Sequence, residues 1–332
     1  MSSYVPPTAT ARGYLCVDNS WGYPVQTTLK SAITFEGTGL HTGAPVRMTL
    51  MPASAEFGIW FRRVDVDERD PLIPARWDVV ASAELCTRIA NADGVSVSTI
   101  EHVMAAVAGT GIHNLLIEID GPEVPILDGS SAEFVRAILA RGLRDQAAPL
   151  RAIEILRPVE VRNGEAYARL LPAAGLEIDF SIDFEDAAIG HQHKRLSMAN
   201  GTFVHELCDS RTFCRQADVD AMHANGLALG GEPGVNAVVF DGDRVLSPGG
   251  LRHADEPVRH KMIDALGDLA LAGAPILGRY EGHRSGHAMT NALLRTLFAR
   301  PGALRMIECT ELQVARLPGA GLTRHDAPAL AA

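Results

Sequence analysis

Toward its C-terminal end the chain reads Val258-Arg-His-Lys-Met-Ile-Asp-Ala-Leu-Gly-Asp-Leu-Ala270, directly after Pro257, a residue that suits the first turn of a helix. His260 and Asp264 stand four residues apart, and this spacing places both side chains on one helical face. An imidazole nitrogen and a carboxylate oxygen held in this way suit a borderline cation such as Zn²⁺. The pair also arises by chance, in which case Asp264 and Asp268 are carboxylates on a polar stripe.

The segment Ser98-Thr-Ile-Glu-His102 supplies a candidate for the third protein ligand that a catalytic zinc requires. His102 would bind the metal, and Glu101 beside it would be free to act on a water molecule, so the residues suggest a hydrolase. Ser98-x-x-Glu101 is also a capping box, in which Glu101 reaches back to the Ser98 amide at a helix start. The sequence leaves both interpretations of Glu101 open.

These two segments occur in one order with further motifs between about residue 28 and residue 312. The other motifs are Thr28-Leu-Lys30, Gly37-Thr-Gly-Leu-His-Thr-Gly43, Pro125-Ile-Leu-Asp-Gly-Ser130, Ser181-Ile-Asp-Phe184, Arg211-Thr-Phe213, Gly226-Leu-Ala-Leu-Gly-Gly231 and Ser285-Gly-His287. In this combination the chain resembles the UDP-3-O-acyl-N-acetylglucosamine deacetylases, zinc amidases that commit an acylated sugar nucleotide to lipid A synthesis.

The fold expected from the pattern is α+β, because groups of strands give way to helices without regular βαβ alternation. Strands are predicted at residues 46–50, 58–61, 114–119, 153–161, 166–171 and 176–184, and a helix at residues 131–143. The resemblance implies two similar domains, each a β-sheet layer with helices, packed helix to helix in a β-α-α-β sandwich with the site at the junction. We expect a flexible N-terminal arm at residues 1–26, a first domain at 27–147, a second domain at 151–317 and a flexible tail at 318–332. A linker at about 144–150 would join the two domains.

The resemblance also assigns the reacting groups. It implies a zinc ion, with Fe²⁺ able to use the same donors, on His102, His260 and Asp264. It implies that Glu101 is the general base and His287 the general acid. The Thr212 hydroxyl would stabilise the oxyanion, and the Asp268 carboxylate would orient His287. The plain alternative for His287 is a histidine that caps a surface helix.

Contacts with the sugar nucleotide are implied for five further residues: Lys261, Phe184, Asp183, Phe213 and His41. Phe184 would pack against the uracil ring, with Asp183 nearby as a hydrogen-bond acceptor. Lys261 could equally be a solvated helix lysine, Phe184 a core phenylalanine, and the glycines around His41 a means of making a tight turn.

Departures from the family pattern fall where a fatty chain would bind. After Phe213 the chain continues with Cys214-Arg-Gln216, where the family usually has glycine and an apolar residue, and one extra residue lies near residues 230–235. A guanidinium is costly to desolvate beside methylenes, so Arg215 leaves open a divergent zinc amidase acting on a different N-acylated amino sugar. A third hypothesis is a paralogue that binds metal without catalysis. The presence of Glu101 and His287 counts against it, because a protein that only binds metal would not need them.

Composition limits the other classes of function. The chain has 332 residues, 47% hydrophobic content and a formal charge of −10, and no Lys/Arg-rich run that would indicate nucleic-acid binding. It has neither a secretory signal nor an apolar run of about 18 residues for a transmembrane segment. We expect reduced thiols and a cytoplasmic location, because the cysteines are odd in number and lack C-x-x-C spacing: Cys16, Cys86, Cys208, Cys214 and Cys309. We also expect a monomer.

Overall fold

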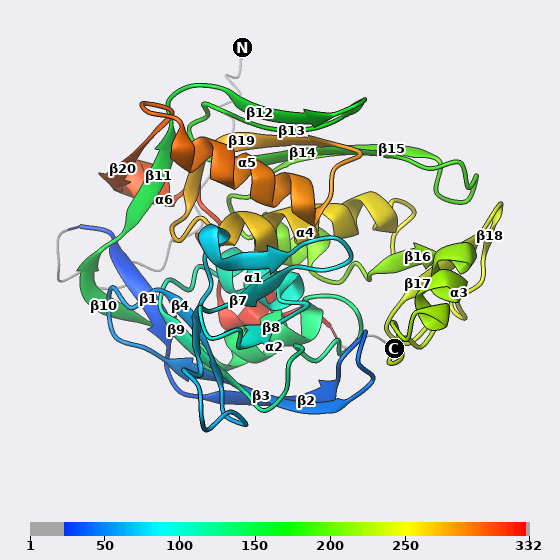
Figure 1. Ribbon diagram of the computed structural model, residues 1–332. Coiled ribbons are helices and arrows are strands. Elements are labelled where there is room, and N and C mark those ends of the chain that lie inside the picture. The colour runs from blue at the N-terminus through cyan, green and yellow to red at the C-terminus, as the bar shows by residue number, and fades with distance from the viewer. Residues whose placement is uncertain (1–22, 330–332) are drawn as a thin grey trace, which may run out of the picture.

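The computed structural model describes residues 23–329, in which helices lie between two β-sheets (Figure 1). A five-stranded sheet forms one outer layer and a seven-stranded sheet forms the other. The layer order is therefore β-α-α-β, and the predicted α+β fold class is confirmed.

The five-stranded sheet has its buried face toward the helices. On its central strand β9 the alternate residues Leu115, Ile117 and Ile119 are all fully buried, as expected for a strand with one face on the core. In spatial order the strands are β2 (Ile33–Thr38), β3 (Pro45–Pro52), β9 (Leu115–Ile119), β4 (Ile59–Arg63) and β5 (Leu72–Pro74). A smaller sheet leads the chain into the helical layer and consists of β6 (Val80–Ser82), β7 (Arg88–Ala90) and β8 (Ser96–Val97).

The seven-stranded sheet is organised around β19 (Ile276–His283), which pairs with three other strands. The remaining strands are β11 (Arg151–Ile155), β12 (Val159–Asn163), β13 (Ala166–Leu171), β14 (Leu176–Asp183), β15 (His191–Ser197) and β20 (Leu304–Glu308). The prediction of one strand at residues 153–161 is wrong, because β11 and β12 are separate. Pro158 lies between them and has no amide hydrogen to donate to a sheet ladder.

The segments that join and flank the two layers are more ordered than expected. Strand β10 (Leu143–Pro149) pairs with β1 (Val25–Leu29), so the predicted linker is largely a strand and the last two residues of the predicted arm belong to β1. Residues 1–22 of that arm lie outside the described residues. Arg136 donates hydrogen bonds to the carbonyls of Pro328 and Ala329, which ties the described part of the predicted tail to helix α2 (Ala132–Arg141).

A separate small unit projects at one end of the molecule, beside the seven-stranded sheet (Figure 1). It consists of β16 (Phe213–Arg215), β17 (Val238–Asp241), β18 (Arg244–Val245) and α3 (Gln216–Ala224). The short helix α6 (Glu311–Val314) lies at the opposite end, next to β20. Single turns occupy Trp77–Val79, Phe203–Leu207 and Arg324–Asp326.

Four helices form the central layer: α1 (Glu101–Gly109), α2 (Ala132–Arg141), α4 (Glu256–Ala270) and α5 (His287–Ala299). Helix α1 crosses α4 at very short distance, since a Cβ atom placed on Gly267 would lie 2.0 Å from the carbonyl oxygen of Glu101. Glycine is needed there because any side chain would push the two backbones apart. The helix predicted around His260 is confirmed, with Pro257 in its first turn.

The cysteines within the described residues are all free thiols, and Cys16 lies outside them. Burial raises the pKa of the Cys86 thiol to about 12, and burial raises that of Cys214 to about 11, so both are protonated at neutral pH. Within residues 23–329, no helix has the length and hydropathy needed to cross a bilayer.

Candidate metal centre and active site

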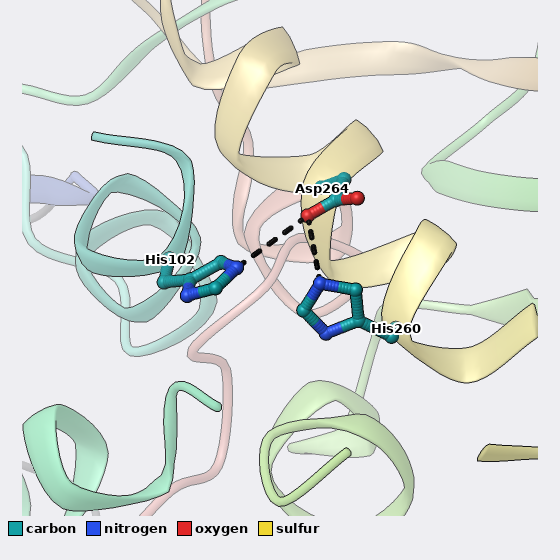
Figure 2. A group of neighbouring side chains, drawn as sticks. All are labelled: His102, His260 and Asp264. Atoms are coloured by element: carbon teal, nitrogen blue, oxygen red, sulfur yellow. Dashed lines mark ion pairs between the residues drawn. The ribbon is translucent and has the colours of Figure 1, made fainter. Parts of the chain in front are cut away.

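Three buried side chains converge where α1 meets α4. His102 lies in the first turn of α1, whereas His260 and Asp264 lie one turn apart on α4 (Figure 2). Their exposed fractions are 4%, 2% and 5%, and one potential ligand atom from each lies within 4.8 Å of the other two. The pair predicted from its helical spacing, His260 and Asp264, and the predicted third ligand, His102, therefore lie together.

The arrangement fits a divalent cation. The Nδ1 atom of His260 donates to the carbonyl of Ser210 at 3.0 Å, which leaves the Nε2 lone pair free, and Nε2 lies 3.3 Å from Asp264 Oδ1. His102 Nε2 lies 3.7 Å from the same oxygen. Asp264 Oδ1 is buried without a hydrogen-bond partner, a costly state for a carboxylate oxygen that a bound cation would relieve.

The second oxygen of Asp264 is held by Lys261. Lys261 Nζ donates to Oδ2 at 2.7 Å. Burial alone would raise the pKa of Asp264, but Lys261 and His260 outweigh it and hold the pKa well below its usual range. Burial alone would lower the pKa of Lys261, and the facing Asp264 outweighs it and raises that pKa. The alternative of a solvated lysine is wrong, because the Lys261 side chain is only 24% exposed and is paired.

Glu101 begins helix α1 and is 3% exposed. Its Oε2 accepts a hydrogen bond from the backbone amide of Thr87 at 3.0 Å. Burial raises the pKa of Glu101, partly opposed by His287 and His102, so the carboxylate is a stronger base than an exposed glutamate. The capping-box alternative is wrong: Ser98 Oγ donates to the carbonyl of Pro122, and the Glu101 carboxylate turns to Thr87 instead.

His287 and Asp268 form a second buried pair beside the three metal candidates. His287 Nδ1 lies 2.8 Å from Asp268 Oδ2, and Asp268 Oδ1 accepts from the Thr87 hydroxyl at 2.6 Å. Burial alone would lower the pKa of His287, but Asp268 and Asp264 outweigh it and raise the pKa to about 10. His287 begins α5 at 7% exposure, so the alternative of a surface capping histidine is wrong.

Comparison with known proteins agrees with this geometry. Residues 26–299 match the family described as UDP-3-O-acyl N-acetylglycosamine deacetylase. A protein of Phenylobacterium zucineum named UDP-3-O-acyl-N-acetylglucosamine deacetylase is 50% identical over 281 residues, which are 85% of this chain and 96% of the relative. Proteins with the same name from Anaeromyxobacter sp. and Idiomarina loihiensis are each 45% identical, over 86% and 87% of this chain and 92% and 94% of their own lengths.

The chain belongs to the UDP-3-O-acyl-N-acetylglucosamine deacetylase family. The resemblance inferred from the ordered motifs is confirmed, and the match covers the five-stranded sheet, the seven-stranded sheet except β20, and every residue of the site. A deacetylase of this family is an amide hydrolase, which agrees with a buried glutamate, Glu101, and a buried imidazole, His287, near a cluster that could hold a metal ion.

Aromatic rings adjoin the metal-binding cluster on the side of the projecting unit. The ring centroid of Phe213 lies 6.3 Å from that of His260, and Lys261 Nζ lies 5.7 Å from the Phe213 centroid. Phe184 packs edge-on against Phe213 at 5.6 Å. Three residues expected to contact the sugar nucleotide thus form one continuous wall, and Phe184 is half-buried within it.

The other two residues expected to contact substrate lie in different settings. Asp183 is exposed, and its carboxylate accepts a hydrogen bond from Arg284 at 2.8 Å. The backbone amide of His41 donates to Glu123, and its Nδ1 atom is buried without a partner. Burial lowers the pKa of His41, partly opposed by Glu123, so the ring is neutral at pH 7.

Thr212 is positioned by its backbone immediately before β16. Its amide donates to the carbonyl of Gly129 at 2.8 Å, and its carbonyl accepts from the amide of Val238 at 2.8 Å. Because Gly129 belongs to the first half of the chain and Val238 to the second, Thr212 is fixed at the junction between them.

Sequence reasoning missed two residues that organise the site. Thr87 bonds both Glu101 and Asp268, and nothing in its own sequence context distinguishes it. Glu123 is 1% exposed, and its carboxylate accepts from the amides of His41 and Thr42 and from the Thr99 hydroxyl. Its isolated charge within Pro122-Glu-Val-Pro-Ile126 was the available signal.

At residues 214–216, where the sequence departs from the family pattern, Arg215 lies at the surface. Arg215 makes a bidentate contact with Asp218, with both nitrogen-to-oxygen distances at 2.8 Å, and its side chain is 41% exposed. The guanidinium is therefore solvated and paired, and it requires no desolvation. Cys214 is absent from the metal-binding cluster found among the described residues.

Proposed function

We propose that this chain hydrolyses the N-acetyl group of UDP-3-O-acyl-N-acetylglucosamine, giving acetate and the free amine, the committed step of lipid A synthesis. The observation that carries the proposal is the orphaned Asp264 oxygen facing His102 and His260, with Glu101 and His287 buried beside it. Family membership supports the substrate, since the relatives named above carry that substrate in their names.

We assign Zn²⁺ to the three donors. Two imidazole nitrogens and one carboxylate oxygen are a common donor set of catalytic zinc, and a fourth position is then free for the reaction. Fe²⁺ uses the same donors and is the alternative metal. A bound Zn²⁺ would polarise the amide carbonyl and lower the pKa of a water molecule in contact with it to about 7.

Glu101 is the general base of this proposal. Its burial and raised pKa suit it to take a proton from the attacking water near neutral pH. The Thr87 amide holds one carboxylate oxygen, so the other is left to face the water. Its position next to His102 keeps the base beside the metal.

His287 is the general acid. An amine leaves an amide readily only after its nitrogen is protonated, and an imidazolium with a pKa near 10 carries that proton at pH 7. Asp268 fixes the tautomer by bonding Nδ1, so Nε2 donates to the leaving nitrogen. The Thr212 hydroxyl donates to the oxygen that gains negative charge when water adds to the carbonyl.

Lys261, Phe213 and Phe184 would bind the sugar nucleotide, and Asp183 and His41 would complete that surface. The solvated Arg215 removes the main motive for a divergent substrate, and the buried Glu101 and His287 weigh against a paralogue that only binds metal. We place the protein in the cytoplasm, because its described cysteines are unpaired thiols, and we retain the monomer as a prediction.

The test is acetate release from UDP-3-O-(3-hydroxyacyl)-N-acetylglucosamine by purified protein loaded with Zn²⁺. Glu101→Gln, assayed beside it, excludes a contaminating hydrolase because it keeps the side-chain shape and loses the base. Turnover by the parent that is lost in the variant supports the proposal. Zinc-loaded parent protein that leaves this substrate intact but deacetylates another amino sugar would replace it with the divergent amidase.

A further inference from the structure

The orientation of one metal ligand depends on a loop that precedes β16. His260 Nδ1 donates to the carbonyl of Ser210, and this bond points Nε2 toward Asp264. Ser210 is followed directly by Arg211 and Thr212, so the same loop carries the acceptor for a ligand and the proposed oxyanion hydroxyl. Whatever fixes this loop therefore fixes two parts of the site.

A buried ion pair fixes the loop to α4. Both the backbone amide and the Nε atom of Arg211 donate to Glu256 Oε1 at 2.9 Å, and Nη2 bonds Oε2 at 3.2 Å. The same Nη2 donates to the carbonyl of Gly250 at 2.7 Å. The two side chains are only 6% and 1% exposed, so they are shielded from solvent.

Glu256 lies four residues before His260 and eight before Asp264 on the same helix. This spacing puts the carboxylate on the helix face that carries the metal ligands, one turn earlier. Glu256 also accepts from the amide of Arg252 at 2.7 Å, so its carboxylate collects donors both from the loop before β16 and from the segment before α4. The ion pair thus couples the loop to the rigid element that holds the metal ligands.

We propose that Arg211 and Glu256 are positioning residues of the metal centre: their ion pair holds the Ser210 carbonyl against His260, and so orients Nε2 for the metal. The inference rests on the metal-binding role in the proposed function and is independent of the substrate. Arginine is required because its planar fork bonds the carboxylate and the Gly250 carbonyl together, which the single ammonium of lysine on its flexible stem cannot reproduce.

The test measures metal binding by Arg211→Lys and Glu256→Gln protein. Groups that orient a metal-bound histidine contribute roughly 10–100-fold to metal affinity, and we expect losses of that size. Zn²⁺ and Co²⁺ affinities are measured by chelator competition at a temperature where circular dichroism shows each variant to be folded. The visible absorption of the Co²⁺ forms reports the ligand geometry, and we expect it to change in both variants.

Arg259→Lys is the matched control. Arg259 is the neighbour of His260 on α4, is 13% exposed, and pairs with Asp255 and Glu206. It makes the same kind of ion pair and bonds the carbonyl of Glu206 in the preceding turn, but none of residues 210–212, so the control should keep the parent metal affinity and Co²⁺ spectrum. An equal loss of affinity in the control would show that loosening of α4 is sufficient and would overturn the proposal.

Folded Arg211→Lys and Glu256→Gln proteins that bind metal within twofold of the parent, with unchanged Co²⁺ spectra, would also overturn it. Should the lysine variant fail to fold, Glu256→Gln decides by the same criteria, because it retains the side-chain shape and an acceptor oxygen. Neither readout involves the substrate, so failure of acetate release would leave this result intact and would count only against the proposed function.

Discussion

The two helices that build the site supply it in different ways. On α4, the proposed reacting and metal-binding groups His260, Asp264 and Asp268 repeat at intervals of four residues, so one rigid helix sets their relative positions. On α1, Glu101 and His102 are adjacent and diverge by about 100° around the helix axis. Their placement depends on the crossing at Gly267 and on Thr87, both from other segments. The positions of the α4 groups are therefore set by local helix geometry, whereas those of the α1 groups are set by tertiary contacts.

The largest effects should follow from removing one ligand from either helix. His260→Ala on α4 and His102→Ala on α1 should each lower Zn²⁺ affinity by more than the roughly 10–100-fold attributed to groups that only orient a ligand. Equilibrium dialysis with metal analysis measures the affinity. Full retention of zinc by either variant would remove that helix from the metal site.

Changing the proposed base on α1 should separate catalysis from metal binding. Glu101→Gln should reduce turnover about 10²–10⁴-fold, because proton transfer from water loses its acceptor, while zinc content stays at the parent level. Steady-state kinetics and metal analysis on the same preparation check both parts. Parent-like turnover would refute the base assignment, and loss of zinc would mean that Glu101 acts by holding His102.

The pH dependence should report the Asp268 and His287 pair. The rate should rise as Glu101 loses its proton and fall as His287 loses its own, since the acid must be protonated. Asp268→Asn removes a carboxylate that raises the His287 pKa but leaves the burial that lowers it. The alkaline limb of the kcat/KM profile should therefore move to lower pH, and an unmoved limb would exclude His287 as its source.

Thr87 connects the two helices and should have a moderate effect. Thr87→Val removes the hydroxyl that bonds Asp268 and keeps the amide that bonds Glu101, so turnover should fall about tenfold, equivalent to ~1.4 kcal/mol. Thr34→Val serves as the control, because the Thr34 hydroxyl bonds that of Thr49 on the exposed face of a sheet. Equal turnover rates in the two variants would show that the hydrogen bond from Thr87 to Asp268 does not contribute to catalysis.

The smallest effect is expected in the projecting unit, away from both helices. Arg215→Gln should change kcat/KM for the proposed substrate by less than about twofold, because the side chain is solvated and its pair with Asp218 is a surface ion pair. Assays with substrates of several acyl lengths measure this. A large change that depends on acyl length would place Arg215 in the acyl-binding surface after all.

Much of this molecule was readable from sequence because periodicity is a local property. The α4 helix, its His260 and Asp264 pair, the strand patterns and the ordered motifs required no knowledge of distant contacts. The break between β11 and β12 was also signalled locally, by Pro158, although the apolar pattern runs on through it. Glu101 was the ambiguous case, since one pattern fitted both a capping box and a base.

The sequence by itself determined the residue types of the site and the spacing of those on α4. Only the tertiary structure decided that Glu101 faces Thr87, that Arg215 pairs with Asp218, and that Arg211 and Glu256 fix the loop behind His260. The physical reason is that a side chain settles on the partner that best compensates its burial, and that partner comes from whichever segment the packed core brings within reach.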